Sequence, residues 1–216
     1  MISYSEKLAE FIGIMLGDGS ICSYPDKSSY TIYVCGNATT DKDYLIKHVK
    51  NLAEQVLNIN FKIKHHSNPE QDGLYLYVYG KKYVELFNNL GLPSGNKMKN
   101  NICIPNWIFK NKKFVRACIR GFFDTDGSIY RHWNSDRYFI EFTTNSLELQ
   151  KTITKALNML DYTSSRWFRA KGSSWRCGIY KKDEVRKFLK DVGTHNSKHR
   201  RRCPNSLVVQ DIGQGR

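Results

Sequence analysis

The sequence has no long apolar run and no secretion signal. No stretch approaches the roughly 18 consecutive apolar residues that a membrane-spanning helix needs. The first residues, MISYSEKLAEF, lack a basic segment followed by an apolar segment and a small-residue cleavage site. The sequence therefore predicts an intracellular protein, of the cytoplasm or an organellar matrix, with no membrane partner.

The cysteines and histidines lack the spacing of a sequence-local metal site. The chain has six cysteines and six histidines, but it contains no CxxC pair and no histidine pair at zinc-ligand spacing. We expect reduced thiols, most of them packed inside, at Cys22, Cys35, Cys103, Cys118, Cys177 and Cys203.

Acidic residues are scarce relative to basic ones. The 216 residues include 20 Asp and Glu but 34 Lys and Arg, which gives a formal net charge of +14. A hydrophobic fraction of 40% is enough for a core, so wholesale disorder is excluded, and the length fits one large domain or two of about 100 residues. Positive charge without a membrane signal indicates a polyanionic partner, most simply nucleic acid.

Arginine is absent from the first half of the chain. Residues 1–108 contain 11 Lys and 10 acidic residues, whereas residues 109–216 contain 23 basic and 10 acidic residues. The second half therefore holds +13 of the +14 charges. We expect it to make more of the phosphate contacts and to contribute the steeper salt dependence.

A nine-residue segment occurs twice. Residues 13–21 read GIMLGDGSI and residues 121–129 read GFFDTDGSI, at an offset of 108 residues. The same offset relates Tyr30, Ile32 and Asn37 to equivalent residues of the second copy, before it slips to 104. Because the match extends past one short motif, one structural unit is used twice.

Each unit is expected to contain the elements αββαββα. Periodicity and alternation predict helices at 5–17 and 113–125, strands at 30–37 and 138–145, helices at 41–57 and 146–160, hairpins at 60–80 and 163–180, and helices at 81–90 and 181–191. Asp41 and Ser146 are the expected N-caps of the middle helices. We predict an α+β fold with two pseudo-symmetric units, residues 1–90 and 110–216, joined by a linker at 91–109.

Small residues line one face of the first helix in each unit. Ala9, Gly13 and Gly17 recur at every fourth position, and the second copy repeats the pattern as Ala117, Gly121 and Thr125. Glycine costs roughly 1 kcal/mol relative to alanine inside a helix. Its repeated use indicates that the two helix backbones pack closely.

Asp18 and Asp126 follow these two helices at their C-terminal ends. A helix C-terminus carries partial negative charge, and packing of the helices brings the two carboxylates together, so both effects disfavour ionisation. A divalent cation removes this penalty, and such ions activate water for phosphodiester hydrolysis. The simpler alternative is that each Asp-Gly pair only forms a helix-to-strand turn.

The two segments resemble the signature motifs of the LAGLIDADG homing endonucleases in their single-chain, two-motif form. They read FIGIMLGDG at 11–19 and IRGFFDTDG at 119–127, and the similarity covers nearly the whole chain. The first motif departs from the signature at Leu16, where the family often has an acid that is not its metal ligand. The final aspartate, which is the ligand, is present in both motifs.

The resemblance implies a monomeric, intron-encoded enzyme that cuts a long double-stranded DNA target and leaves short 3′ overhangs. It implies paired motif helices between two antiparallel sheets that form a DNA-binding saddle. Asp18 and Asp126 would hold Mg²⁺, with Mn²⁺ able to substitute, and the backbone carbonyls of Gly17 and Thr125 are candidate further ligands.

The family also places an amide and a basic residue near each metal. Asn37 and Asn145 match the amide, which holds solvent. Lys99 and Lys198 are the symmetric choices for the basic residue, each six residues before a proline. Three further lysines stay open as alternatives: Lys97, Lys81 and Lys181.

Outward-facing strand residues are candidate DNA contacts, because a sheet fits the major groove. The set is Thr31, Tyr33, Lys62, Lys64, Tyr75, Tyr77, Glu141, Thr143, Arg169 and Arg176. The basic run at 195–202 adds Arg200 and Arg201 as phosphate contacts, with a nuclear-targeting patch or a solvated tail as alternatives.

Two other functions use the same scaffold. An RNA maturase or a non-cleaving, sequence-specific DNA-binding protein is the main alternative, but such descendants commonly lose one acid and both are present here. The second is the endonuclease domain of an intein. The chain has no initial Cys or Ser and ends in Gly-Gln-Gly-Arg, so we do not expect self-splicing of it.

Overall fold

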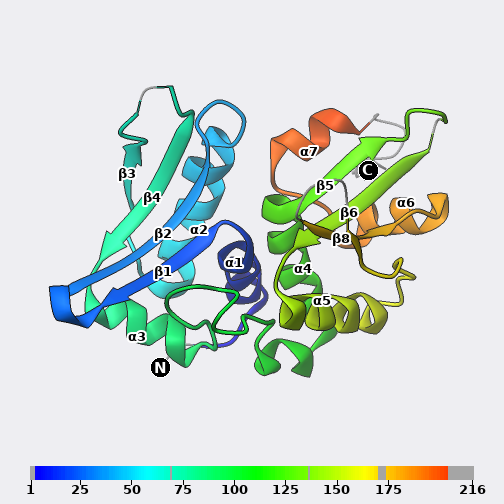
Figure 1. The fold of residues 1–216 in the computed structure, drawn as a ribbon. Helices are drawn as coiled ribbons and strands as arrows, with labels where there is room; N and C mark the ends of the chain where they lie inside the picture. The colour runs from blue at the N-terminus through cyan, green and yellow to red at the C-terminus, as the bar shows by residue number, and fades with distance from the viewer. Residues whose placement is uncertain (1–2, 69, 136, 170–173, 204–216) are drawn as a thin grey trace, which may run out of the picture.

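The structure, a computed structural model, describes residues 3–68, 70–135, 137–169 and 174–203. Figure 1 shows two halves side by side, with helices α1 and α4 at their junction. None of the helices in the described ranges combines the length and apolar character needed to cross a membrane.

The two halves repeat one order of elements. The first contains α1 (Glu6–Gly17), β1 (Gly19–Tyr24), β2 (Ser29–Asn37), the π-helical η2 (Tyr44–Val49) continuing into α2 (Lys50–Leu57), β3 (Lys62–His65), β4 (Gly73–Tyr79) and α3 (Lys81–Asn89). The second contains α4 (Lys112–Asp126), β5 (Gly127–Arg131), β6 (Tyr138–Thr144), α5 (Leu147–Met159), β7 (Phe168–Arg169), β8 (Trp175–Ile179), α6 (Lys182–Asp191) and α7 (Ser197–Arg202). Short 3₁₀ turns lie at Pro25–Lys27 and Asn106–Lys110. The predicted α+β class and the αββαββα order are confirmed.

Each half has one antiparallel four-stranded sheet. The strand orders are β1-β2-β4-β3 and β5-β6-β8-β7. Gly19 pairs with Val34 in the first sheet, and Gly127 pairs with Phe142 in the second, so the first hairpins share the same register. The inner faces are apolar, with Ile32, Val34, Ile140 and Phe142 fully buried. Helices cover these faces and leave the opposite faces open.

The glycine stripes bring α1 and α4 into backbone contact. A Cβ atom placed on Gly13 would lie 2.0 Å from the carbonyl oxygen of Cys118. A Cβ atom on Gly121 would lie 2.1 Å from the carbonyl oxygen of Glu10. No side chain larger than hydrogen fits at either position, so the sequence pattern sets how closely the two halves approach.

One predicted helix cap is wrong. Ser146 caps α5, because its hydroxyl accepts a hydrogen bond from the backbone N–H of Leu149. Asp41 does not cap its helix. Its carboxylate instead accepts hydrogen bonds from the Asn37 N–H and the Asn196 side chain and pairs with Lys198. These partners come from the end of β2 and from the second half of the chain.

Two irregular segments link the halves. The linker after α3 packs on the second half, where Ser146 Oγ donates to the Ile102 carbonyl and the Ile104 N–H donates to Thr152 Oγ1. Residues 193–203, which we call the strap, follow α6 and contact the first half through Asn196 and Lys198. The linker therefore contacts the second half, and the strap contacts the first.

Candidate functional site

The two motif aspartates lie together where α1 and α4 end. Asp18 directly follows α1, and Asp126 is the last residue of α4. A Cβ atom on Gly17 would lie 3.5 Å from the carboxyl carbon of Asp126, so the last turn of α1 abuts the second aspartate. Gly19 and Gly127 allow the following strands to turn back sharply, because a Cβ atom on either would clash with the preceding helix.

Burial and mutual repulsion disfavour negative charge at this pair. Burial raises the pKa of Asp18 to about 7, and the Asp126 carboxylate is the next cause. Burial also raises the pKa of Asp126. Lys97 and Lys198 act against both shifts without removing them. The pair therefore has a deficit of positive charge, which is the condition that favours cation binding.

Lys97 of the linker is one of the two lysines that act on both aspartates. Its ammonium donates to the carbonyl oxygens of Leu16 (2.9 Å) and Gly17 (2.5 Å) at the C-terminus of α1. Burial lowers the pKa of Lys97, while the Asp126 and Asp18 carboxylates raise it. The carbonyl oxygens at the end of α1 are therefore bound by a cationic side chain of the protein itself.

A pocket of about 290 Å³ opens beside Asp126. Lys97, Thr143 and Asn145 also line it. This half of the site thus brings together an aspartate, a lysine and an amide, as the family resemblance implies. The Asn145 side-chain oxygen accepts a hydrogen bond from the Trp175 N–H, which orients the amide.

The other half of the site has one more acid. Lys198 of the strap pairs with Asp41 at 3.1 Å and lowers the pKa of Asp18. The Asp41 carboxylate in turn raises the pKa of Asp18. The pKa of Asp41 itself is lowered, because interactions with Asn196 and Lys198 outweigh the effect of burial. Asn37 is turned toward its own loop, where its side-chain oxygen accepts from Thr39 and Thr40.

Asp124 holds the strap that carries Lys198. Its buried carboxylate accepts hydrogen bonds from the Thr194 hydroxyl and the His195 N–H. Asn196 donates to the Asp124 carbonyl and to Asp41. Burial raises the pKa of Asp124 to about 6, and the bonds from the strap oppose that rise. Asp124 is the counterpart of Leu16 in the second motif, and it positions the strap.

The other lysine candidates lie elsewhere. Lys99 is exposed on the linker, and its backbone N–H is bound by Asn96. Lys81 and Lys181 pair with Glu85 and Glu184 on the third helices of their own halves. The structure therefore brings Lys97, instead of Lys99, to the aspartate pair, where Lys198 also acts. The equal spacing of Lys99 and Lys198 from Pro105 and Pro204 does not identify the lysine at the site.

The open face of the first sheet gathers most of its predicted DNA contacts. A pocket of about 360 Å³ is lined by Thr31, Tyr33, Lys64, Tyr75 and Tyr77, together with His65, His66 and Ser67. The Lys64 ammonium lies over the rings of Tyr75 and Tyr77, at 5.6 and 5.3 Å from the ring centres. Lys62 is exposed on the adjacent strand.

On the second sheet, Glu141 differs from expectation. Its side chain has the predicted outward parity but is buried, because Tyr130 and Tyr180 donate to one carboxylate oxygen. Arg176 lies 3.5 Å from the other oxygen and keeps an exposed side chain. Glu141 is thus engaged within the protein, and Arg176 is the group that faces solvent.

Thr143 lines the pocket beside Asp126, and the other predicted contacts are exposed arginines. Arg169 lies on β7, and Arg200 and Arg201 lie on α7. Arg200 donates to the Thr194 carbonyl. Sequence reasoning missed Asp41 and Asp124 as site residues. The repeat gives one indication of Asp41, because Asp41 is charged and its counterpart in the second copy, Ser146, is neutral.

Comparison with known families matches both halves separately. A profile described as a LAGLIDADG-like domain matches residues 113–193. A profile described as the WhiA LAGLIDADG-like domain matches residues 8–82.

Several relatives are much longer than the matched segment. The chain is 31% identical over 140 residues to the RNA polymerase subunit Rpo1C of Methanocaldococcus jannaschii, covering 64% of this chain and 14% of that protein. It is 31% identical over 155 residues to the replication factor C small subunit of the same organism, covering 71% of this chain and 7% of that protein. It is 25% identical over 202 residues to a probable cell division protein WhiA of Clostridium beijerinckii, covering 91% of this chain and 61% of that protein.

Solved structures share the whole architecture. The homing endonuclease I-DmoI in complex with DNA and Ca superposes with a TM-score of 0.61 at 16% identity, covering 94% of this chain and 95% of that one. The homing endonuclease I-WcaI bound to its DNA recognition sequence gives a TM-score of 0.62 at 13% identity, covering 94% and 88%. With a LAGLIDADG-like profile matched in each half, two motif helices in contact and this shared architecture, the chain has the LAGLIDADG fold in its single-chain, two-motif form.

Proposed function

We propose that the protein is a site-specific DNA endonuclease that hydrolyses both strands of a long duplex target in a metal-dependent reaction. The observation that carries the proposal is the pair of half-buried carboxylates, Asp18 and Asp126, where α1 and α4 end. Their raised pKa values mark a site with too little positive charge of its own. A role as simple turn formers gives no reason for two acids to lie together in a half-buried site.

The residues present fit a divalent metal. Asp18 and Asp126 supply oxygen ligands of the kind Mg²⁺ and Mn²⁺ prefer, and the Gly17 carbonyl would be a further ligand if Lys97 released it. A bound ion would activate water and stabilise the leaving oxygen of the phosphodiester. Lys97 and Lys198 both act electrostatically on the two aspartates, and their ammonium groups would stabilise the charge that develops on the phosphate.

The sheets supply the DNA-binding surface of this proposal. The first offers tyrosines and lysines around its pocket, and the second offers Arg176 and Arg169. The strap adds Arg200 and Arg201 as phosphate contacts. Two solved relatives with this fold, I-DmoI and I-WcaI, were crystallised with DNA, which supports the same use of the fold here.

A non-cleaving role is the second candidate, favoured by the similarity to WhiA over 91% of this chain. Other relatives include an RNA polymerase subunit and a replication factor subunit, of which the chain matches only 14% and 7%. An RNA polymerase subunit and a replication factor subunit have different activities. The match to a small part of each therefore indicates a module that occurs within larger polypeptides. Binding and cleavage must therefore be tested separately.

Selection of a target is the experiment that tests this function. We would isolate duplexes from a randomised library by their binding to the protein in Ca²⁺, and then incubate them with the protein in Mg²⁺. The proposal expects one enriched sequence that is cut on both strands. An enriched sequence that stays intact in Mg²⁺ and Mn²⁺ would favour the WhiA-like role, and no enrichment would reject both candidates.

The lysine assignment gives a direct prediction. Lys97→Met and Lys198→Met should each lower the cleavage rate of the selected duplex by about 10²-fold, because each removes a charge beside the reacting phosphate. Lys99→Met, two positions away on the same linker, should change the rate less than twofold. Single-turnover rates at saturating protein provide the measurement. Equal losses from Lys97→Met and Lys99→Met would contradict the assignment.

Metal affinity should depend on pH through Asp18. Its pKa of about 7 means that the carboxyl is increasingly protonated as the pH falls below 7, and a metal must displace that proton. The Kd for Ca²⁺ in the DNA complex should rise about tenfold for each pH unit below 7 and be constant above it. Calorimetric titrations check this slope. A constant Kd between about pH 5.5 and pH 8.5 would contradict it.

The same shift has a consequence for stability without metal. A carboxyl whose pKa is raised in the folded state stabilises that state at low pH and loses this contribution as the pH rises from about 4 to about 7. Asp18→Asn removes this dependence. The difference in free energy of unfolding between wild type and variant should therefore change over that pH window, with the wild type losing stability relative to the variant as the pH rises.

A further inference from the structure

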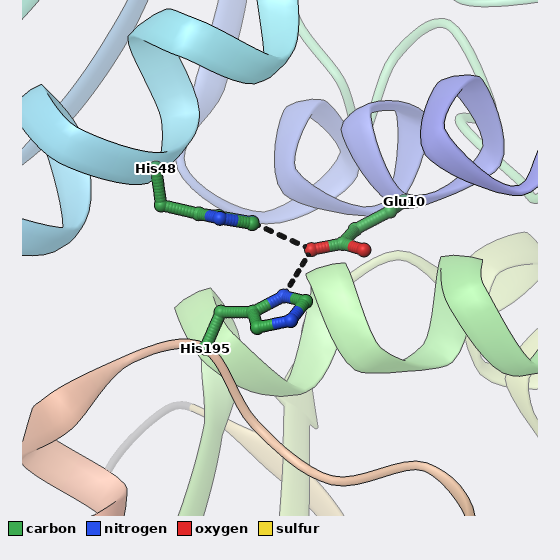
Figure 2. Close-up of side chains that lie close together, drawn as sticks. All are labelled: Glu10, His48 and His195. Atoms are coloured by element: carbon green, nitrogen blue, oxygen red, sulfur yellow. Dashed lines mark hydrogen bonds and ion pairs between the residues drawn. The ribbon is translucent and has the colours of Figure 1, made fainter.

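Two histidines and a glutamate meet at the junction of the halves, away from the motif aspartates. Figure 2 shows Glu10 of α1 between His48 of η2 and His195 of the strap. His48 Nε2 and His195 Nδ1 each lie 2.7 Å from the same atom, Glu10 Oε1. Glu10 lies eight residues before Asp18, which places it about 12 Å away along the helix axis. The proposed nuclease chemistry uses none of the three residues.

The carboxylate at the centre of this cluster is ionised. Glu10 is only 3% exposed, and burial alone would raise its pKa. Hydrogen bonds from His195, His48 and Arg120 outweigh burial and hold the pKa of Glu10 far below its usual range. Arg120 binds the other carboxylate oxygen, Oε2, through Nε and Nη2. Glu10 Oε1 is therefore the oxygen that faces the two imidazoles.

We propose that Glu10, His48 and His195 form a transition-metal site, with Zn²⁺ as the expected ion. A carboxylate oxygen and two imidazole nitrogens are a recurrent zinc donor set. The three ligand atoms lie within 4.8 Å of one another, and they converge from three segments far apart in the sequence. Imidazole ligands favour zinc over Mg²⁺, so this site is chemically distinct from the aspartate pair.

The cluster needs only a small adjustment to hold the ion. Ligands around a tetrahedral zinc are separated by about 3.3 Å, so each imidazole would move outward by a few tenths of an ångström. Both side chains have room, because His48 is 26% exposed and His195 is 39% exposed. Solvent supplies the fourth ligand. Each imidazole would bind the ion through the nitrogen that faces Glu10 and keep a proton on its other ring nitrogen.

Arg120 has a defined place in this arrangement. It stays on Glu10 Oε2 and orients the carboxylate from outside the metal coordination, as outer partners of zinc ligands do. Its positive charge weakens the affinity but does not occupy the ligand oxygen. The ion would join α1 and η2 of the first half to the strap of the second, and the inference stands whether or not the protein cleaves DNA.

Metal titration of the full chain tests this inference. We would measure Zn²⁺ binding by calorimetry, record the visible spectrum with Co²⁺, and follow the melting temperature, for wild type, His48→Gln and His195→Asn. His65→Asn, at an exposed histidine outside the cluster, is the matched control. A second metal, Mg²⁺, serves as the comparison ion.

The wild type should bind one equivalent of Zn²⁺, and Co²⁺ should give a four-coordinate spectrum without a thiolate band. Zn²⁺ at about 100 times its Kd should raise the melting temperature by about 5–10 °C, and Mg²⁺ should not. His48→Gln and His195→Asn should weaken Zn²⁺ binding at least about tenfold, and His65→Asn should not.

Three outcomes would overturn the inference. Absence of saturable Zn²⁺ binding would show that the cluster is a hydrogen-bonded ion cluster only, even if both histidine variants melt earlier. Equal binding by wild type and both variants would place the ion elsewhere. A thiolate band with Co²⁺ would assign it to the free cysteines.

Discussion

Replacement of Asp18 or Asp126 by asparagine is expected to abolish double-strand cleavage while leaving DNA binding intact. Loss of a metal ligand removes several kcal/mol of transition-state stabilisation, which corresponds to a fall in rate of about 10³-fold or more. Asparagine has nearly the same shape as aspartate. It removes both the cost of burying a negative charge and the repulsion between the two carboxylates. The metal-free variants should therefore be at least as stable as the wild type.

Strand-resolved kinetics on the selected duplex provide the measurement. Each variant should bind that duplex in Ca²⁺ within about threefold of wild type, since phosphate and base contacts made elsewhere dominate affinity. Asp43→Asn is the matched control, because Asp43 is an exposed acid of the first half that pairs only with Lys47 in the described bonds. Unfolded Asp18→Asn and Asp126→Asn proteins would point to a purely structural role for the pair.

Gly13→Ala and Gly121→Ala are expected to destabilise the fold more than any other methyl additions on α1 and α4. The new Cβ would lie 2.0 Å from the Cys118 carbonyl oxygen or 2.1 Å from that of Glu10. Because these obstacles are backbone atoms, relief requires the helices to separate. We expect each change to lower the free energy of unfolding by about 3–5 kcal/mol. Chemical denaturation with circular dichroism measures the loss.

Gly17→Ala provides the contrast. Its new Cβ would meet a side chain, 2.0 Å from Thr125 Oγ1 and 2.8 Å from Thr125 Cβ. Thr125→Ala removes the hydroxyl and should recover part of the stability, with a coupling energy of about 1–2 kcal/mol in the double-mutant cycle. No side-chain change is expected to rescue Gly13→Ala. A Gly13→Ala protein as stable as wild type would contradict the close contact of α1 with α4.

Local pattern was enough to predict the elements and their duplication. The first helix was expected at 5–17 and spans Glu6–Gly17, and the second strand was expected at 30–37 and spans Ser29–Asn37. These signals are local, since periodicity and the Asp-Gly ends act within a few residues. The small-residue stripe also indicated the helix contact, because glycine in a helix is unfavourable without one.

The parts that sequence reasoning missed depend on contacts between distant segments. Lys97 bonds to the carbonyl oxygens of Leu16 and Gly17, which lie 81 and 80 positions before it in the chain. Glu141 has the parity of a DNA contact, but Tyr130 and Tyr180 from the neighbouring strands engage it. The cluster around Glu10 joins residues 185 positions apart. Residue spacing holds no information about such meetings, which the packed fold alone creates.

We propose above all that the protein cleaves the DNA it recognises, using the aspartate pair and a divalent metal. The most direct test is incubation of the Ca²⁺-selected duplex with the protein in Mg²⁺, with both product ends sequenced. The account predicts one cut in each strand at a fixed position, short 3′ overhangs, and no product in chelator or with Asp126→Asn. A selected duplex that is bound tightly and stays uncut in Mg²⁺ and in Mn²⁺ would contradict it.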